Sequence, residues 1–196
     1  HLTSSSVNVL ELFKPISAFI FDVDGVLTDG TVLVLEGGLQ ARKMHIKDGF
    51  ALQMALKKGY NVKVISGGNS PEVADRLEKL GVKDVSMSVL DKKKFLLDYM
   101  HAKKLEKEQV LYMGDDLPDL PALGLVGLAC CPADAVAEIR EAVHYISPFN
   151  GGAACVARSS AHDIHFLPAF SKQILKEIAQ QLQRHILEGQ GRPMEQ

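Results

Sequence analysis

Four carboxylates stand where apolar segments of the sequence give way to glycine-containing turns. Asp22 and Asp24 end one such segment, and Asp115 and Asp116 end another. If these side chains converged, they would repel one another strongly unless a cation lay among them. Oxygen-only ligands suit Mg²⁺, which keeps several waters and shares itself with the phosphate of a substrate. The sequence therefore predicts a magnesium site that also binds the phosphate group of a substrate.

The spacing of Asp22 and Asp24 suggests catalysis. Residues two apart on an extended strand share a face, so both carboxylates can reach the same phosphorus atom. One can attack as the nucleophile, while the other protonates the leaving oxygen and later activates water. Gly25 allows the sharp turn that follows and leaves room for a phosphoryl group. A DxDG pattern alone is also common in ordinary turns, so this interpretation depends on the motifs that accompany it.

A second glycine-rich turn supplies groups that can bind a phosphate. Ser66 follows an apolar segment, and its hydroxyl, with the backbone N–H groups of Gly67 and Gly68, forms a candidate phosphate cradle. Lys92, at the start of an expected helix, is the candidate to neutralise the remaining charge. Taken singly, these are ordinary loops and helix starts. Several such motifs in this order, each after an expected strand, are hard to explain by chance.

The elements that must position these motifs alternate between strand and helix. Apolar runs that stop at turn residues predict strands, and apolar residues at helical spacing predict helices. We expect strands at 17–23, 62–65, 84–87, 110–113, 125–130 and 143–146, helices at 48–58, 70–80, 91–104, 133–142 and 171–187, and a β-hairpin at 31–45. This alternation predicts an α/β fold, a Rossmann-like three-layer sandwich with a central parallel sheet. The carboxyl ends of its strands would gather the motifs in one cleft.

Length and composition fit one globular domain. The chain has 196 residues, of which 46% are hydrophobic, and its net charge of −2 argues against a nucleic-acid partner. We expect a single domain over 1–196, with a core at about 16–150 and a tail with a helix at 151–196. No run approaches about 18 apolar residues, so no membrane span is expected. The three cysteines form no CxxC pair, which favours a reducing compartment, the cytoplasm, over a disulfide framework or a zinc site.

Together these motifs resemble those of the haloacid dehalogenase-like phosphatases. Residues 21–30 (FDVDGVLTDG) look like the first motif of that family, 65–67 (ISG) like the second, Lys92 like the third and 114–119 (GDDLPD) like the fourth. The VLTDG continuation, the hairpin and the KDGF stretch are similar to the subfamily of 3-deoxy-D-manno-octulosonate 8-phosphate phosphatases. That subfamily consists of capless enzymes that assemble as homotetramers. The resemblance covers about residues 16–146.

The resemblance implies a role for each motif residue. Asp22 would be the nucleophile that forms an aspartyl-phosphate. Asp24 would be the general acid and base, with its backbone carbonyl on Mg²⁺, and Asp115 would complete the protein ligands of the metal. Asp116 and Asp119 would lie around these ligands without binding the ion directly.

The resemblance also implies residues that bind the substrate, a small sugar-acid phosphate. The phosphoryl oxygens would be held by Ser66, Gly67 and Lys92. The sugar acid would be contacted by His45, Ile46, Lys47, Asp48, Gly49, Gln53 and Arg76. The implied reaction is Mg²⁺-dependent hydrolysis of a phosphomonoester in the cytoplasm, as a step in lipopolysaccharide biosynthesis.

Two departures from the subfamily leave the substrate open. The subfamily commonly carries Arg directly after the glycine of the second motif, where this chain has Gly68. Its usual tail combines glycines with basic residues and closes over a neighbour's active site, whereas residues 151–158 here (GGAACVAR) keep only the glycines of that pattern. Both changes remove cations that would bind an acidic sugar phosphate.

Two alternative functions therefore stay open. They are a phosphatase for a nine-carbon keto-acid 9-phosphate and a non-catalytic tetramerisation module related to domains of nucleotide-sugar synthetases. The intact Asp22 and Asp24 speak against the module.

Overall fold

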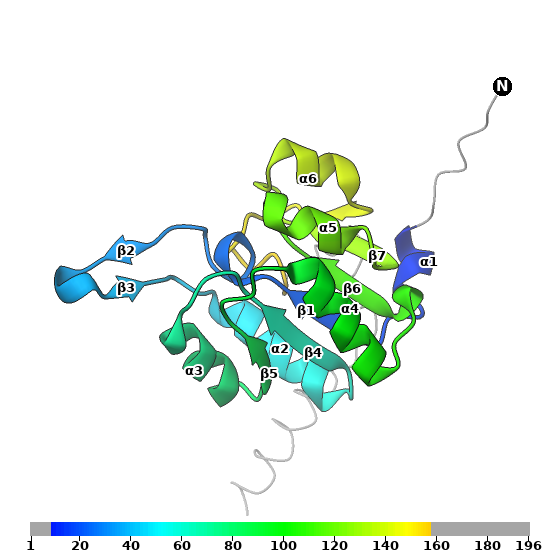
Figure 1. Cartoon of the computed structure of the whole chain (residues 1–196), viewed down its shortest axis with the longest axis horizontal. Helices are drawn as coiled ribbons and strands as arrows, with labels where there is room; N and C mark the ends of the chain where they lie inside the picture. The colour runs from blue at the N-terminus through cyan, green and yellow to red at the C-terminus, as the bar shows by residue number, and fades with distance from the viewer. Residues whose placement is uncertain (1–8, 158–196) are drawn as a thin grey trace, which may run out of the picture. The chain divides into compact units, whose positions relative to one another are not determined.

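A parallel β-sheet of six strands lies at the centre of the described residues, 9–157, in this computed structural model (Figure 1). The strand order is β5-β4-β1-β6-β7-β8, and every neighbouring pair is parallel. The strands are β1 (Ala18–Phe21), β4 (Asn61–Ile65), β5 (Asp84–Ser86), β6 (Val110–Met113), β7 (Leu128–Cys131) and β8 (Tyr145–Ile146). The expected Rossmann-like parallel sheet is confirmed.

Helices cover the sheet on both sides. They are α1 (Val9–Phe13), α2 (Ile46–Lys57), α3 (Pro71–Lys79), α4 (Lys92–Lys103), α5 (Leu120–Leu123) and α6 (Ala137–Ala142). Helices α4 and α5 lie in front of the sheet in Figure 1, and α2 lies behind it. Local chemistry sets the helix starts: Asp91 caps α4 by accepting a hydrogen bond from the Lys94 backbone N–H (2.9 Å), and Pro71 occupies the first turn of α3.

The core follows the alternation of side chains along the central strands. Ile20 of β1 and Tyr112 of β6 are fully buried and pack in one apolar cluster with Leu96 of α4 and Ile139 of α6. Phe21, adjacent to Ile20, points to the opposite face, because successive strand residues alternate. Each large apolar side chain buried in this way contributes about 1.5–3 kcal/mol relative to an exposed one. The strands β1 and β6, which precede the Asp22 and Asp115 motifs, are therefore anchored in the core.

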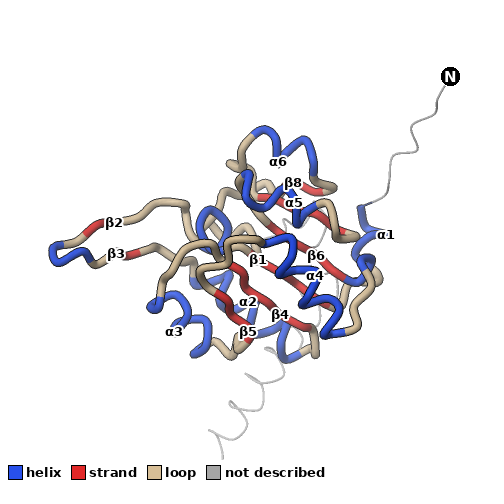
Figure 2. Tube along the Cα trace, in the orientation of Figure 1, coloured by secondary structure: helices blue, strands red, loops and turns tan. Residues whose placement is uncertain are grey.

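The β-hairpin projects away from the sheet (Figure 2). Its paired residues are β2 (Leu33–Val34) and β3 (Gln40–Ala41), joined by a short 3₁₀ turn over Glu36–Gly38. The pairing is shorter than the expected 31–45, although a single bridge between Thr28 and Met44 closes the base. Its apolar side chains stay exposed, with Val34 70% accessible.

Several element boundaries differ from the sequence expectation. Helix α2 begins at Ile46 rather than 48, because the His45 Nδ1 accepts a hydrogen bond from the Lys47 backbone N–H and caps the helix there. Helix α6 begins at Ala137 rather than 133, since the preceding residues form turns. The short helices α1 and α5 were not expected. The expected helix at 171–187 lies outside the described residues, and within them no helix is long and apolar enough to cross a membrane.

Candidate active site

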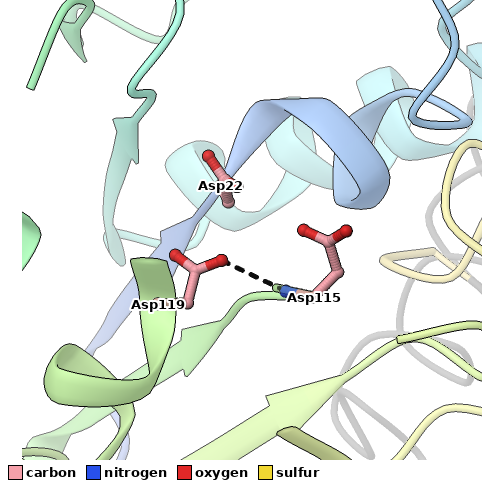
Figure 3. Close-up of side chains that lie close together, drawn as sticks. All are labelled: Asp22, Asp115 and Asp119. Carbon is pink, nitrogen blue, oxygen red and sulfur yellow. Dashed lines mark hydrogen bonds between the residues drawn. The ribbon is translucent and has the colours of Figure 1, made fainter. Parts of the chain in front are cut away.

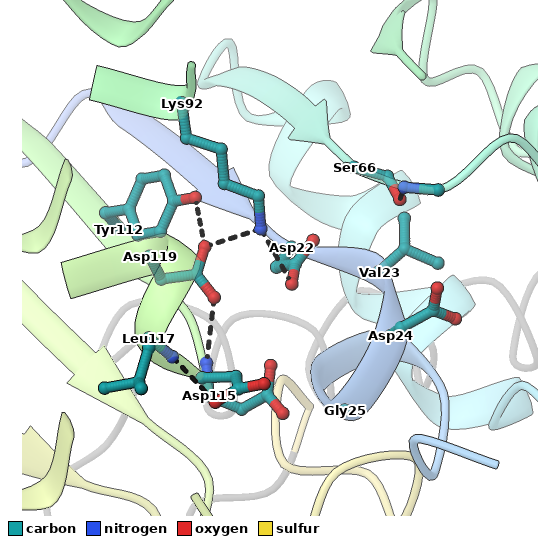
Figure 4. A network of polar contacts seen from close by, with 12 residues as sticks. Asp22, Val23, Asp24, Gly25, Ser66, Lys92, Tyr112, Asp115, Leu117 and Asp119 are labelled. Atoms are coloured by element: carbon teal, nitrogen blue, oxygen red, sulfur yellow. Dashed lines mark hydrogen bonds and ion pairs between the residues drawn. The ribbon is translucent and has the colours of Figure 1, made fainter. Parts of the chain in front are cut away.

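The carboxyl ends of β1, β4 and β6 bring the sequence motifs into one cleft, as predicted. The cleft has a volume of about 420 Å³. Of the predicted residues, it is lined by Asp22, Asp24, Ser66, Gly67, Lys92, Asp115, Asp116 and Asp119. It is also lined by Gly30, Gly68, Val89, Leu90 and Pro118. Figure 4 shows how the polar members of this cleft face one another.

Asp22 stands at the end of β1 as a buried carboxylate beside a buried cation. Its backbone N–H donates to the Met113 carbonyl (3.0 Å), which extends the pairing of β1 with β6 by one residue. Its Oδ2 lies 2.9 Å from the ammonium of Lys92, and both side chains are less than 10% exposed. Burial raises the pKa of Asp22 to about 7, with Asp119 adding to the rise and Lys92 opposing it. Additional positive charge at this carboxylate would therefore stabilise its ionised form.

Asp119 connects the lysine to the acidic loop. Its Oδ1 accepts hydrogen bonds from the Lys92 ammonium (2.7 Å) and the Tyr112 hydroxyl (2.7 Å), and its Oδ2 accepts one from the backbone N–H of Asp115 (3.2 Å). Burial lowers the pKa of Lys92, but the carboxylates of Asp22 and Asp119 outweigh it and raise the pKa overall. The lysine is thus held as a cation. Sequence analysis missed Tyr112, which lies inside β6 and gave no polar signal.

Asp22, Asp115 and Asp119 form an acidic cluster that can hold a metal ion. One oxygen from each lies within 4.8 Å of the others (Figure 3). Both oxygens of Asp119 already accept hydrogen bonds, so Asp22 and Asp115 are the better ligands. The buried Oδ1 of Asp115 has no hydrogen-bond partner among the described residues, and burial together with Asp119 and Asp116 raises its pKa to about 7. A hard divalent cation would satisfy this orphaned oxygen.

Gly25 leaves the space that Asp115 needs. Its φ of +85° is in the left-handed region, and a Cβ built there would collide with the Asp115 carboxylate. The two acidic motifs, 90 residues apart in sequence, therefore approach closely only because this position is glycine.

Asp24 does not join this cluster. Its carboxylate points away from Asp22 in Figure 4 and instead pairs with Arg42, at 2.6 Å between Nε and Oδ1. Its predicted metal ligand is the backbone carbonyl, so the position of the side chain leaves that prediction untested. Arg42 follows β3 directly, and sequence analysis missed it, because a hairpin's sequence does not show where the hairpin folds relative to the sheet.

The turn at Ser66 lines the cleft, as expected, but some of its N–H groups already donate hydrogen bonds within the protein. Ser66 is buried, and its Oγ accepts a hydrogen bond from the Gly68 backbone N–H at 3.1 Å. The Ser66 backbone N–H donates to the Ser86 carbonyl (2.9 Å). In this state Ser66 and Gly67 line the cleft, while the Gly68 amide is engaged within the turn itself.

The residues expected to contact the sugar acid are dispersed. Ile46 and Arg76 line a second groove of about 510 Å³, between the hairpin and α3, which Arg42 also lines. Asp48 is buried, and its Oδ1 accepts hydrogen bonds from the backbone N–H groups of Val156 (3.1 Å) and Ala157 (2.8 Å). The His45 imidazole caps α2 as described above. Lys47 is exposed, Gly49 is buried, and Gln53 is half-buried on the same helix.

The glycines at 151 and 152 pack against the first motif. The Gly152 backbone N–H donates to the Val26 carbonyl (3.0 Å), and a Cβ at Gly151 would collide with the Gly25 carbonyl. The described tail therefore supports the loop that carries Asp24.

The sequence is similar to those of known proteins. A family model of haloacid dehalogenase-like hydrolases matches residues 84–158. The 3-deoxy-D-manno-octulosonate 8-phosphate phosphatase of Haemophilus influenzae is 35% identical over 133 residues, which cover 68% of this chain and 74% of that protein. The corresponding phosphatase of Escherichia coli K12 is 30% identical over 151 residues, 77% of this chain and 80% of that protein.

The fold is also similar to that of a solved phosphatase structure. It is the 3-deoxy-D-manno-octulosonate 8-phosphate phosphatase from Moraxella catarrhalis in complex with a magnesium ion, a phosphate ion and a KDO molecule. The TM-score is 0.74 at 29% identity, over 76% of this chain and 86% of that chain. The chain belongs to the haloacid dehalogenase-like hydrolases and, within them, to the family of 3-deoxy-D-manno-octulosonate 8-phosphate phosphatases. It is accordingly a phosphoric monoester hydrolase.

Proposed function

We propose that this enzyme hydrolyses a keto-sugar acid phosphate, specifically 3-deoxy-D-manno-octulosonate 8-phosphate, with Mg²⁺ and through an aspartyl-phosphate on Asp22. The observation that carries the proposal is the placement of Asp22. Its buried carboxylate lies near the Lys92 ammonium and near the Asp115 oxygen that lacks a hydrogen-bond partner among the described residues, in a cleft that the phosphate-binding turn also lines. The similarity to the phosphatase crystallised with magnesium, phosphate and KDO supports the metal and the substrate class.

The residues of the cleft divide the reaction between them. Asp22 attacks the phosphorus, and Lys92, fixed by Asp119, favours the ionised form of that carboxylate and attracts the phosphoryl oxygens. Asp22, Asp115 and the backbone carbonyl of Asp24 would hold the metal, which supplies positive charge to the phosphoryl group when bound. Asp24 gives a proton to the leaving oxygen and then takes one from the water that releases phosphate.

A nine-carbon keto-acid 9-phosphate is the second candidate substrate. A Cβ at Gly68 would lie 3.2 Å from the Asp24 Oδ2 and 3.6 Å from the Ser66 Oγ, so any side chain at this position would enter the cleft. Glycine leaves this room free for a larger leaving group. The non-catalytic tetramerisation module is disfavoured because Asp22 and Asp24 are both present and Lys92, held by Asp119, contacts the Asp22 carboxylate.

We also propose that the enzyme works as a homotetramer in the cytoplasm. The hairpin exposes Leu33 (63%), Val34 (70%) and Leu39 (62%), more apolar surface than a projecting hairpin retains alone in water. Packing of hairpins from several copies would cover it. The three cysteines are buried free thiols, which suits a reducing compartment.

A substrate screen tests the proposal. Purified full-length protein is assayed with Mg²⁺ for phosphate release from the eight-carbon and nine-carbon keto-acid phosphates, from hexose 6-phosphates and from p-nitrophenyl phosphate. We expect kcat/KM for the eight-carbon acid phosphate to be the highest, and Asp22→Asn serves as the blank. A higher value for the nine-carbon ester would select the second candidate. Equal values for all esters, or no Mg²⁺-dependent release, would overturn the proposal.

A further inference from the structure

The Arg42 guanidinium contacts the Asp24 carboxylate. Its Nε lies 2.6 Å from the Asp24 Oδ1 and its Nη2 lies 3.4 Å from Oδ2, so the guanidinium meets both oxygens of the carboxylate. The Arg42 side chain is only 8% exposed, whereas that of Asp24 is 38% exposed. A two-point contact from a planar guanidinium fixes the orientation of a carboxylate as well as its position.

Few other groups of residues 9–157 hold the Asp24 carboxylate in place. The Thr28 hydroxyl donates to Oδ1 at 3.4 Å, the same length as the contact of the Arg42 Nη2 with Oδ2, so the 2.6 Å bond from the Arg42 Nε is the short one. Gly68, the nearest residue of the phosphate-binding turn, has no side chain, and a Cβ there would lie 3.7 Å from the Arg42 Nη2. A Cβ at position 68 would therefore contact both Asp24 and Arg42.

The direction in which Arg42 holds the Asp24 carboxylate determines whether Asp24 can give a proton to the leaving oxygen. The carboxylate points away from Asp22 (Figure 4) but still lines the cleft. In-line phosphoryl transfer places the leaving oxygen on the side of phosphorus opposite the attacking oxygen. A proton donor for that oxygen must therefore lie on the side of the cleft away from the Asp22 carboxylate, which is where Arg42 holds Asp24.

We propose that Arg42 is a positioning residue that holds Asp24 on the leaving-group side of the cleft, and that it acts on the reaction through Asp24 alone. The inference rests on the proposed function, which takes Asp24 as the general acid and base. In the first step an Asp22 oxygen bonds to phosphorus, the bond from phosphorus to the ester oxygen breaks, and that oxygen takes the Asp24 proton to leave as an alcohol. In the second step Asp24 accepts a proton from water, whose oxygen displaces Asp22 and releases inorganic phosphate.

Two substrates with different leaving groups test the role of Arg42. The leaving alkoxide of 3-deoxy-D-manno-octulosonate 8-phosphate needs a proton, whereas p-nitrophenolate leaves without one, and kcat/KM reports the step that forms the phosphoenzyme. We expect Arg42→Met to lower kcat/KM for the sugar-acid ester by about 100-fold and for p-nitrophenyl phosphate by about threefold or less. Arg42→Lys, which keeps one charged donor, restores part of the loss. Lys43→Met removes the exposed neighbouring cation and leaves both values unchanged.

A double-mutant cycle separates positioning from direct substrate binding. In an Asp24→Asn background, Arg42→Met should cost about threefold or less, because the residue it positions is already disabled. The same large cost in both backgrounds, or an equal loss for both esters, would mean that Arg42 contacts the substrate and would overturn the inference. Thermal unfolding of each variant checks folding, and Arg42→Gln provides the same comparison if Arg42→Met does not fold.

Different results would refute the proposed function and the positioning role of Arg42. If the wild-type enzyme hydrolyses neither ester, the proposed function is wrong. If the wild type hydrolyses both esters and Arg42→Met does so at unchanged rates, the function stands and the role of Arg42 is refuted.

Discussion

Lys92 and Asp119 form a buried ion pair, 2.7 Å from Nζ to Oδ1, in which the lysine side chain is 5% exposed and the aspartate 1%. The second carboxylate on this lysine is Asp22, so the pair fixes the cation that faces the proposed nucleophile. Asp119 was expected from the sequence only as an acidic companion of the metal ligands. Its contacts show that it orients Lys92, Tyr112 and the Asp115 backbone together.

Removing Asp119 should therefore be costly. Asp119→Ala leaves a buried ammonium and a buried tyrosine hydroxyl without their shared acceptor, and we expect a loss of about 3–5 kcal/mol in the free energy of unfolding. Urea denaturation monitored by circular dichroism measures it. The control is Asp116→Ala in the same motif, an exposed residue whose carboxylate caps the Leu117 backbone N–H, with an expected loss of about 1 kcal/mol. Similar losses for the two variants would contradict the role of Asp119.

Metal binding should depend on pH through Asp22 and Asp115. In the metal-free protein the pKa of each carboxyl is raised to about 7, mainly by burial. The folded state then binds more protons than the unfolded state between about pH 4 and pH 7, so these groups make the metal-free protein less stable as pH rises through that window. Mg²⁺ requires both groups ionised. We expect Mg²⁺ to raise the unfolding temperature much more at pH 8 than at pH 5.

Differential scanning fluorimetry in excess chelator and in excess Mg²⁺ makes this comparison. Asp115→Asn is the matched control, because it removes one raised pKa and one ligand and should abolish most of the Mg²⁺ shift. A shift of equal size at both pH values, in wild type and variant, would exclude these carboxylates as the metal site.

Asp48 should act on stability rather than on substrate binding. Its Oδ1 accepts two backbone hydrogen bonds from the tail, at Val156 and Ala157, and its side chain is buried. Asp48→Ala should cost about 1–3 kcal/mol and speed amide hydrogen exchange at these two residues, while Asp48→Asn keeps an acceptor oxygen and costs less. If Asp48 contacts the sugar acid, as the family resemblance implies, Asp48→Asn would instead raise KM at unchanged stability.

The hairpin should carry the subunit contacts. Val34→Asp places a charge on an apolar face that we expect to be covered by another copy, and should convert the tetramer into smaller species. Light scattering coupled to gel filtration reports the mass, with Glu36→Gln at the hairpin tip as the control that keeps the tetramer. Activity should fall with dissociation, because neighbouring copies would supply walls to the open cleft. A wild-type monomer with full activity at assay concentration would rule this out.

The gathering of the motifs in one cleft was predictable because these motifs end neighbouring parallel strands. Asp22, Ser66 and Asp115 each follow an apolar strand, and the carboxyl ends of such strands meet at one edge of the sheet whatever the loops do. Contacts made across loops were not predictable. The pairing of Arg42 with Asp24 depends on how the hairpin leaves the sheet, and a local sequence pattern carries no information about that direction.

Asp48 illustrates the same limit in another way. The family resemblance implies that Asp48 contacts the sugar acid, and that prediction stays untested. The fold buries Asp48, and its Oδ1 accepts hydrogen bonds from the backbone of Val156 and Ala157, more than 100 residues away in sequence, which no local pattern reveals. Short helices were also missed. Helix α5 is only four residues long, too short for a periodic apolar pattern to be visible.

The central claim is that Asp22 is the nucleophile of a Mg²⁺-dependent phosphatase. The most direct measurement is the rate of phosphate release from 3-deoxy-D-manno-octulosonate 8-phosphate by wild type and Asp22→Asn, both with Mg²⁺ and both shown to be folded by thermal unfolding. An amide cannot form the acyl-phosphate, so we expect the variant's kcat to fall on the order of 10⁴-fold or more. A folded Asp22→Asn protein that retains a tenth or more of the wild-type rate would contradict the account.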